Sequence, residues 1–408
     1  MIRAARDNTR AVFLYPGHMA GAGALMRTEA FSGVLVEAGP GGAPALFADP
    51  LEIVTCAQGN DAAAALERLE EARRAGFWIA GVASYELGHA LEPKLASLAA
   101  RGDGTLLTFG IFKAPSDAAP LLAQAEAESA GVTVSEVTPL WDRAAYAERF
   151  HEIKAMIARG DLYQVNLTMP MALRFDGAPL GLWGAMRRFQ PVGHGAYVSL
   201  GDTQILSRSP ERFFRLEADG RIVVAPMKGT APRGDDPAQD ADLRDALAQD
   251  PKNRAENIMI VDLMRNDLSR LSRVGSVTVP ALLEVETYAT VHQMVSRVEA
   301  QLEGAPALPE LMRALFPCGS ITGAPKIAAM QAIHRLERWQ RGAYCGAIGW
   351  AGPDGRADFN VAIRSLTVTG IGRARMGVGG GIVHDSVCED EYEEALWKSR
   401  FVTGLIPR

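Results

Sequence analysis

The 408-residue sequence contains few cysteines and no excess of basic residues. Its four cysteines form neither a CxxC pair nor a zinc-type spacing with histidine, which suits a reducing compartment and predicts a cytoplasmic protein. The formal net charge of −6 argues against a nucleic-acid partner, because no surplus cations are present to displace counterions from phosphates. The sequence also lacks a signal-peptide core and any uncharged apolar run of membrane length, so we expect no membrane association.

Strand-like and helix-like segments come in clusters instead of alternating strictly. This arrangement favours an α+β fold with largely antiparallel sheets over a doubly wound fold. The apolar spacing and the capping residues predict helices at residues 141–158, 237–268, 325–339 and 388–403. Strands are predicted at residues 203–208, 212–217, 221–225, 344–350, 359–368 and 375–378. We expect an N-terminal region, 1–130, and a second region, 131–408, to form one intertwined globular unit.

The C-terminal segment GVGGGIVHDSVCEDEYEEALWKSR combines a glycine run with an acidic helix. The glycines are Gly377, Gly379, Gly380 and Gly381. They indicate that backbone without side chains comes close to another group at this segment. In the helix, Glu391 and Glu394 are three residues apart and Lys398 follows one turn later, so the three should share a face. The alternative is a solvated charged helix with a salt bridge between residues four apart.

The segment PKNRAENIMIVDLMRNDLSR should form a helix that projects Glu256 on one face. Magnesium prefers oxygen ligands and commonly takes one or two carboxylates, so Glu256 and Glu394 could form such a site if their helices approach each other. The other possibility is a set of structural ion pairs. For Asp262, Arg265 and Asp267 we favour the ion pairs.

In CGSITGAPKIAAM, a Gly-Ala-Pro turn opens a helix that carries Lys326 in its first turn. Ser320 and Thr322 precede the turn. Free amides and the positive end of a helix dipole suit a carboxylate at this place. A lysine in the first turn is unfavourable unless an anion joins it, which is a further indication of a ligand.

In VVAPMKGTAPRG, Lys228 lies in a Pro/Gly-rich turn that follows a strand. It is not a phosphate-loop lysine, because the order here is Lys-Gly-Thr and the required upstream glycine is absent. A lysine in such a turn is usually a solvated charge. A nucleophilic role would require burial or a neighbouring cation to lower its pKa, and composition does not decide between the two.

Seven motifs taken together resemble the chorismate-utilising enzymes: SRSPERFF, PMKGTAPRG, RAENIMIVDLMRND, SITGAPK, GAYCGAIGW, NVAIRSL and GGGIVHDSVCEDEYEEALWKSR. The resemblance covers residues 140–408 with the motifs in family order, and SYELGHALEPKL extends it more loosely into the N-terminal region. It implies a sandwich of two large antiparallel sheets with helices outside and an active site between the sheets. Region 131–408 would then be the chorismate-binding catalytic region.

Lys228 is the residue that implies a particular reaction within this family. Members that make anthranilate typically carry alanine in the Pro-x-x-Gly-Thr turn, whereas members that aminate C4 of chorismate carry lysine. The resemblance therefore implies conversion of chorismate and ammonia to 4-amino-4-deoxychorismate, the precursor of p-aminobenzoate and folate, through a covalent lysine intermediate. Glu211, in SPER, matches the family's acid/base position. His292 matches a histidine beside the leaving group, and its alternative is a buried histidine with satisfied hydrogen bonds.

The other site residues follow from the same resemblance. Glu256 and Glu394 would bind Mg²⁺ directly and Glu391 through water. With the metal, the ring carboxylate would be held by the amides near Gly323 and Ala324 and by Lys326 and Lys398. The enolpyruvyl carboxylate would be held by Tyr344, Arg364 and the amides of Gly379 and Gly381. Two positions depart from the family pattern: Ser320 stands where a threonine is usual, and Asn253 replaces a glutamate.

No cysteine lies in a glutaminase nucleophile turn, so the resemblance implies that a separate glutamine amidotransferase subunit supplies the ammonia. The main rival is anthranilate synthase component I. An isochorismate or salicylate synthase is a further alternative, as is a non-catalytic chorismate-binding partner. Lys228 argues against the enzyme rivals, and the intact set of Glu211, Lys228, Glu256 and Glu394 argues against the last.

Overall fold

The computed structural model describes residues 31–57, 59–99, 104–288 and 291–407. Residues 32–408 form one compact unit, and the first thirty residues of the expected N-terminal region lie outside the described part. No helix in the described ranges is long and apolar enough to cross a membrane.

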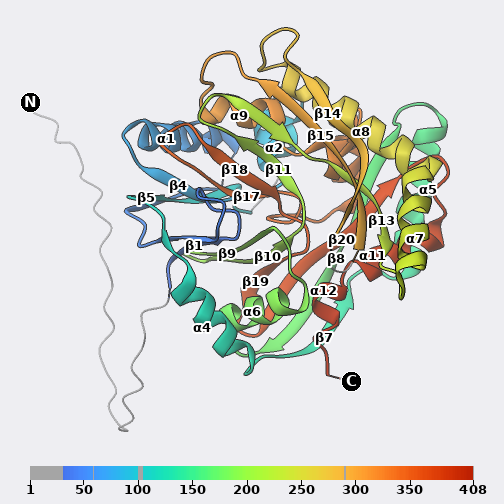
Figure 1. The fold of residues 1–408 in the computed structure, drawn as a ribbon, viewed down its shortest axis with the longest axis horizontal. Helices are drawn as coiled ribbons and strands as arrows, with labels where there is room; N and C mark the ends of the chain where they lie inside the picture. The colour runs from blue at the N-terminus through green and yellow to red at the C-terminus, as the bar shows by residue number, and fades with distance from the viewer. Residues whose placement is uncertain (1–30, 58, 100–103, 289–290, 408) are drawn as a thin grey trace, which may run out of the picture. The chain divides into compact units, whose positions relative to one another are not determined.

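Two ten-stranded antiparallel sheets form the protein (Figure 1). Sheet A runs in the order β16 (Gly323–Ala324), β8 (Gln164–Asp176), β20 (Arg373–Ile382), β19 (Ser365–Gly370), β10 (Thr203–Ser209), β9 (His194–Leu200), β1 (Gly33–Val36), β2 (Ala45–Ala48) and β6 (Ser116–Asp117), with β7 (Thr133–Pro139) also on β8. Sheet B runs in the order β13 (Met227–Pro232), β15 (Val291–Gln301), β12 (Arg221–Val224), β11 (Arg212–Leu216), β18 (Ala357–Val361), β17 (Ala347–Ala351), β4 (Trp78–Ala83), β5 (Leu107–Phe112) and β3 (Glu52–Cys56), with β14 (Thr278–Thr287) also on β15. The expected α+β fold with two large antiparallel sheets is confirmed.

The core lies between the two sheets. Val34 and Val198 of sheet A share one buried apolar cluster with Val82, Ile348 and Trp350 of sheet B. Strands alternate their side chains, so each sheet presents one apolar face to the other. The burial of these faces is what holds the two sheets together.

Strands from both sides of residue 130 occur in both sheets. In sheet A, β1 pairs with β9, and in sheet B, β4 pairs with β17. The expected division at residue 130 therefore does not separate one sheet from the other, and as a domain boundary it stays a prediction.

Helices lie on the outer sides of the sheets. Figure 1 shows α1 (Ala62–Arg74) and α9 (Leu308–Leu315) on the side of sheet B, and α4 (Ala119–Ser129) and α6 (Pro179–Phe189) on the side of sheet A. The remaining helices are α2 (Leu87–Leu91), α3 (Ala96–Ala99), α5 (Arg143–Ala158), α7 (Pro237–Gln249), α8 (Pro251–Ser269), α10 (Lys326–Glu337), α11 (Cys388–Trp397) and α12 (Arg400–Thr403).

Two expected elements are each divided in the structure. The single helix expected over 237–268 is α7 followed by α8, because Asp250 is extended (ψ 114°) before Pro251 and its carboxylate caps the new helix by accepting the Asn253 N–H at 2.7 Å. The strand expected over 359–368 is β18 followed by β19. Arg364 between them has a positive φ of 50°, which interrupts an extended strand.

Candidate active site

The glycine run lies in β20, along an edge that has lost its strand partner. β8 pairs with β20 over its whole length, from Arg373 to Ile382. β19 pairs with β20 only as far as Met376. From Gly377 onward, the edge of β20 that faces away from β8 is therefore open.

Backbone groups of Gly379 and Gly381 point to this open edge. Their partners on β8 are Thr168 and Asn166, whose N–H groups donate elsewhere: Thr168 to the Glu337 carboxylate and Asn166 to the Thr322 carbonyl, both at 2.8 Å. In an antiparallel pair, two opposed residues either exchange both hydrogen bonds or point both sets of groups away. The amides of Gly379 and Gly381 are thus available to an external acceptor.

Three charged side chains of the C-terminal helix surround Gly380. A Cβ on Gly380 would come within 3.2 Å of Glu391 Oε2, 3.4 Å of Lys398 Nζ and 4.0 Å of Glu394 Oε1. Lys398 donates to the Gly379 carbonyl at 2.9 Å and pairs with Glu394 at 2.8 Å. The expectation that these three side chains share one face is confirmed. Burial alone would raise the pKa of Glu394, but Lys398 holds it below its ordinary value.

Glu256 comes to this group from α8. Burial raises its pKa, the charge of Glu394 raises it further, and Lys228 and Lys252 oppose the rise. Within the described part of the chain, the Glu256 carboxylate has no hydrogen-bond or ion-pair partner, so it is a partly buried anion beside other anions. Among the described residues, no three His, Cys, Asp or Glu side chains lie close enough together to form a metal-ligating cluster.

Lys228 is within electrostatic range of this acidic group and of Glu211. It is half-buried in β13, next to Gly229 (φ 83°), where the register of β13 on β15 shifts. Its charge acts to lower the pKa of Glu256, Glu394 and Glu211. A single ammonium group is therefore within electrostatic range of both sets of carboxylates.

Glu211 is buried, with 6% of its surface exposed, and Ser320 Oγ donates to its Oε1 at 2.8 Å. Burial raises the pKa of Glu211 despite this hydrogen bond and the nearby charges of Lys228 and Arg364. The Arg364 guanidinium, whose pKa burial lowers, makes no hydrogen bond or ion pair with any described residue. Arg364 is therefore a cation that is oriented by its strand break and still free to bind an anion.

Lys326 is occupied by the protein itself. Its ammonium donates to Asp267 Oδ2 at 2.5 Å and to the Leu315 carbonyl at 3.2 Å. The expected ion pairing of Asp267 is confirmed, and so is that of Asp262 with Arg265 at 2.8 Å. A role for Lys326 at the substrate carboxylate stays a prediction that would require it to change partners.

Thr322 and Tyr344 take part in the walls of the site. The buried Thr322 hydroxyl donates to the Gly319 carbonyl at 3.1 Å, ahead of β16, which joins Gly323 and Ala324 to the end of β8. The Tyr344 ring lies against Gly377, where a Cβ would come within 2.2 Å of the ring. The absence of a side chain at Gly377 therefore makes room for the tyrosine.

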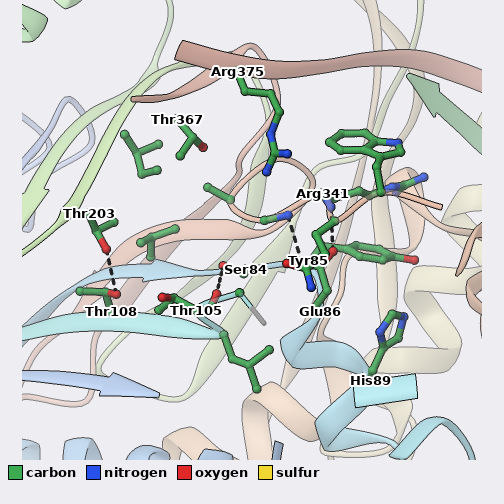
Figure 2. Close-up of a pocket in the computed structure, with 18 of the residues that line it drawn as sticks. Ser84, Tyr85, Glu86, His89, Thr105, Thr108, Thr203, Arg341, Thr367 and Arg375 are labelled. Atoms are coloured by element: carbon green, nitrogen blue, oxygen red, sulfur yellow. Dashed lines mark hydrogen bonds between the residues drawn. The ribbon is translucent and has the colours of Figure 1, made fainter. Parts of the chain in front are cut away.

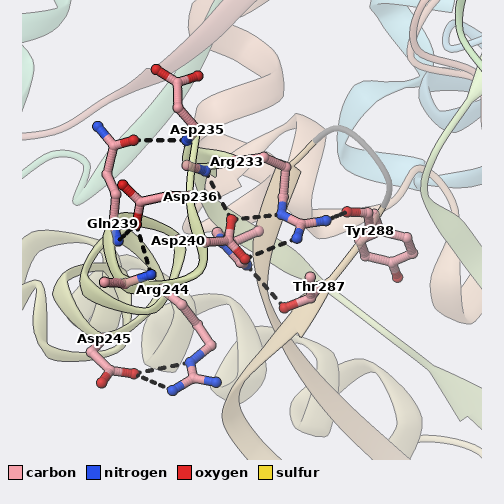
Figure 3. A network of polar contacts seen from close by, with 12 residues as sticks. Arg233, Asp235, Asp236, Gln239, Asp240, Arg244, Asp245, Thr287 and Tyr288 are labelled. Carbon is pink, nitrogen blue, oxygen red and sulfur yellow. Dashed lines mark hydrogen bonds and ion pairs between the residues drawn. The ribbon is translucent and has the colours of Figure 1, made fainter.

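His292 has partners on both ring nitrogens. Nδ1 lies 2.9 Å from Thr287 Oγ1 and Nε2 lies 2.9 Å from Asp240 Oδ1. Arg233 holds Asp240 in turn and lowers its pKa (Figure 3). This is the arrangement of a buried histidine with satisfied hydrogen bonds, so a catalytic role for His292 stays a prediction.

Gln164 is a site residue that the sequence reasoning missed. It is fully buried at the start of β8, and neither atom of its side-chain amide has a hydrogen-bond partner among the described residues. A Cβ on Gly381 would come within 2.3 Å of Gln164 Nε2, which places the amide beside the open edge of β20. The available signal was a glutamine inside the strand-forming run YQVNLTM.

Comparison with known proteins finds one family, described as chorismate binding enzyme, that matches residues 34–404. The aminodeoxychorismate synthase of Streptomyces pristinaespiralis is 46% identical over 255 residues, which are 62% of this chain and 35% of that protein. Aminodeoxychorismate synthase component 1 of Salmonella typhimurium is 43% identical over 270 residues, 65% of this chain and 59% of that protein. The matched part of the chain thus spans about one third to three fifths of the length of these relatives.

Relatives with other names also match. Anthranilate synthase component 1 3 of Haloarcula marismortui is 41% identical over 267 residues, 64% of this chain and 52% of that protein. Among solved structures, anthranilate synthase component I from Streptococcus pneumoniae superposes with a TM-score of 0.74 at 23% identity, over 96% of this chain and 95% of that chain. At that identity the superposition shows the shared fold alone.

Proposed function

The chain belongs to the family of chorismate binding enzymes, and we propose that it acts as component I of an aminodeoxychorismate synthase. It would convert chorismate and ammonia to 4-amino-4-deoxychorismate and water, which leads to p-aminobenzoate and folate. The observation that carries the proposal is the position of Lys228, within electrostatic range of Glu211, Glu256 and Glu394. The relatives named aminodeoxychorismate synthase support it.

The proposed reaction has two displacement steps. In the first, the neutral amine of Lys228 adds at C2 of the chorismate ring, the C4–O bond breaks, and Glu211 protonates the departing hydroxyl so that it leaves as water. In the second, ammonia adds at C4, the C2–N bond to Lys228 breaks, and the Glu211 carboxylate accepts a proton from the new ammonium. Burial favours the protonated form of Glu211 that the first step requires.

Binding of the enolpyruvyl carboxylate is proposed at Arg364 and the open edge of β20. The planar guanidinium can donate two parallel hydrogen bonds to a carboxylate, and the available amides of Gly379 and Gly381 can add two more. Tyr344 would complete this subsite. The side-chain amide of Gln164 beside Gly381, which has no hydrogen-bond partner among the described residues, suits a small polar reactant at this subsite.

A magnesium ion is proposed at the acidic group. Glu256 and Glu394 would hold it directly and Glu391 through water. The donor chemistry fits, since Mg²⁺ takes carboxylate oxygens and keeps waters. The partnerless Glu256 carboxylate, whose pKa burial and Glu394 raise, also indicates a site that a cation would stabilise. When bound, the ion supplies positive charge that helps Lys398 and the amides of β16 to hold the ring carboxylate.

We also propose that ammonia comes from a glutamine amidotransferase partner and that the protein is cytoplasmic. The name "component 1" of several relatives supports a partner. Burial raises the pKa of Cys318 and Cys345 to about 12, which disfavours the thiolate that a glutaminase nucleophile needs. None of the four cysteines, all of which lie in the described residues, forms a disulfide bond, as a reducing compartment would keep them.

The proposal is tested by incubating the purified chain with chorismate, Mg²⁺ and ammonium and identifying the product by mass spectrometry. We expect 4-amino-4-deoxychorismate. Anthranilate or isochorismate as the product would refute the proposed function in favour of a rival enzyme.

A matched pair of variants tests the nucleophile. Lys228→Arg keeps the positive charge near Glu211 and Glu256 but removes the amine, so it should lose both turnover and the covalent adduct detected by peptide mass mapping. Lys252→Ala removes a neighbouring lysine and should leave the adduct on Lys228. An adduct that persists in Lys228→Arg would exclude Lys228 as the nucleophile.

A further inference from the structure

A cavity of about 580 Å³ lies apart from the candidate active site (Figure 2). Its wall comes from both sheets: from the ends of β4 and β5 in sheet B, and from β10, β19 and β20 in sheet A. The rest of the lining comes from α2, α3, α10, the residues just before β5 and the segment between α10 and β17. None of the residues predicted for chorismate, magnesium or catalysis lines this cavity. Its volume is in the range of sites that hold small molecules.

One part of the wall is polar and another is apolar. The polar part carries hydroxyl groups, with Thr108 Oγ1 and Thr203 Oγ1 only 3.2 Å apart and Thr367 beside them (Figure 2). The apolar part includes Ile205 and the indole of Trp339. Such a lining suits a ligand that has an apolar body and a polar end.

Arg375 supplies a solvent-exposed positive charge that no described residue pairs with. Its side chain reaches from β20 into the cavity, and its guanidinium carbon lies 5.9 Å from the centroid of the Trp339 ring (Figure 2). No described residue forms an ion pair or hydrogen bond with it. Arg338, also in the wall, is likewise without an ion pair among the described residues, so the cavity carries a local positive charge.

The acids of the wall do not offset this charge. Both carboxylate oxygens of Glu86 accept backbone N–H groups, from Arg341 at 2.7 Å and from Gly342 at 3.0 Å. Burial also raises the pKa of Glu86 to about 7, which reduces its negative charge near neutral pH. Asp202 is exposed on the turn before β10 and makes no ion pair with Arg375. The exposed guanidinium of Arg375 has no ion-pair partner among the described residues, so it is available to an anion that enters the cavity.

We propose that this cavity binds a small organic monocarboxylic acid with an apolar ring. The guanidinium of Arg375 holds the carboxylate through two parallel hydrogen bonds, and the ring of the ligand packs on Trp339 and the apolar wall. Trp339 also stacks on Tyr344, with ring centroids 6.3 Å apart and planes at 22°. The ligand thus lies behind the wall of the candidate active site, in a site distinct from that of chorismate.

The test uses three acids, benzoate, cyclohexanecarboxylate and indole-3-acetate, each paired with its neutral amide. Binding to the whole chain is measured by saturation-transfer NMR and isothermal titration calorimetry without chorismate. At least one acid should bind saturably below about 10 mM and roughly tenfold more tightly than its amide, because a charge-assisted hydrogen bond contributes that much or more. Failure of all three acids to bind saturably in this range, or binding of every acid no tighter than that of its amide, would overturn the proposal.

Variants locate the binding. Arg375→Gln should weaken the acid at least about tenfold, and Arg375→Lys should have an intermediate effect because it keeps the charge but loses the planar fork. The matched control is Arg373→Gln, which changes a second exposed arginine of β20 that does not line the cavity and should leave the affinity unchanged. Arg364→Gln should also leave it unchanged. Loss of binding in Arg364→Gln with normal binding in Arg375→Gln would assign the acid to the chorismate site and refute the second site, independently of which reaction the enzyme catalyses.

Discussion

Adjacent glycines in β20 should respond in opposite ways to the same substitution. In Gly379→Ala, the new Cβ would lie 2.1 Å from the Leu167 carbonyl oxygen and 2.7 Å from the Thr168 Cα, and both of these atoms belong to the backbone of β8. Backbone cannot move aside as a side-chain tip can, so the two strands must separate locally. Overpacking of this kind costs about 1–3 kcal/mol, and we expect Gly379→Ala to fall at the upper end.

In Gly380→Ala, the Cβ would meet only the ends of Glu391, Lys398 and Glu394, at 3.2 Å or more. The loss of backbone freedom in the unfolded chain stabilises an alanine variant by about 0.4–1 kcal/mol, which offsets a mild contact. Stability should therefore change by less than about 1 kcal/mol. The charged groups, however, must shift by a few tenths of an ångström, so kcat/KM for chorismate should fall roughly tenfold.

The assay compares urea midpoints, followed by tryptophan fluorescence, with steady-state kinetics at saturating Mg²⁺. Gly379→Ala should unfold at clearly lower urea than the parent chain, and Gly380→Ala near the parent midpoint but with reduced turnover. A parent-like midpoint for Gly379→Ala, or a larger loss of stability in Gly380→Ala, would refute the strand pairing from which both predictions come.

Three further substitutions test the groups around the site. Ser320→Ala removes the hydrogen bond that stabilises charged Glu211, so the pKa of Glu211 should rise further. Because the first step requires protonated Glu211, the loss of activity on the alkaline side should move to higher pH. A kcat/KM–pH profile that moves to lower pH would contradict this. Glu256→Gln should raise the half-saturating Mg²⁺ concentration roughly tenfold or more, because it removes one carboxylate charge. The urea midpoint should stay near that of the parent chain. Unchanged Mg²⁺ dependence in kinetics or calorimetry would exclude the metal assignment. His292→Asn should lower the free energy of unfolding by about 1–3 kcal/mol through the loss of buried hydrogen bonds, and a variant of normal stability without activity would instead favour a catalytic role.

Local pattern was sufficient for much of the fold. The helix expected over 141–158 is α5, which begins at Arg143 after the capping Asp142 and ends at Ala158, before Gly160. The strand expected over 375–378 was too short, because a run of glycines looks like a loop when taken alone. β20 continues to Ile382 since its pairing with β8 supplies the order that glycine lacks.

The strand break at Arg364 could not be predicted from local sequence. A positive φ at a non-glycine residue is uncommon and has no sequence signature in NVAIRSL. The break nevertheless shapes the candidate site, because β19 begins only after it, which leaves β20 unpaired on that edge beyond Met376, and because it brings a free guanidinium near Glu211. Backbone strain and the proposed carboxylate-binding role coincide at this residue, and the surrounding sheet maintains the strain.

The motifs identified the charged residues of the site more reliably than they identified which of those residues are free to bind a ligand. Lys326 and His292 each fit a motif position, yet each is held by a carboxylate far away in sequence, Asp267 at a separation of 59 residues and Asp240 at a separation of 52. No local pattern encodes such pairings, because they depend on how α10 approaches α8 and how α7 packs on β15. Glu256 and Arg364 show the converse, since each is partly or mostly buried without a partner among the described residues. Such burial is costly for a charge unless a ligand or an ion compensates it, so the groups left without partners indicate the binding site more directly than the motifs do.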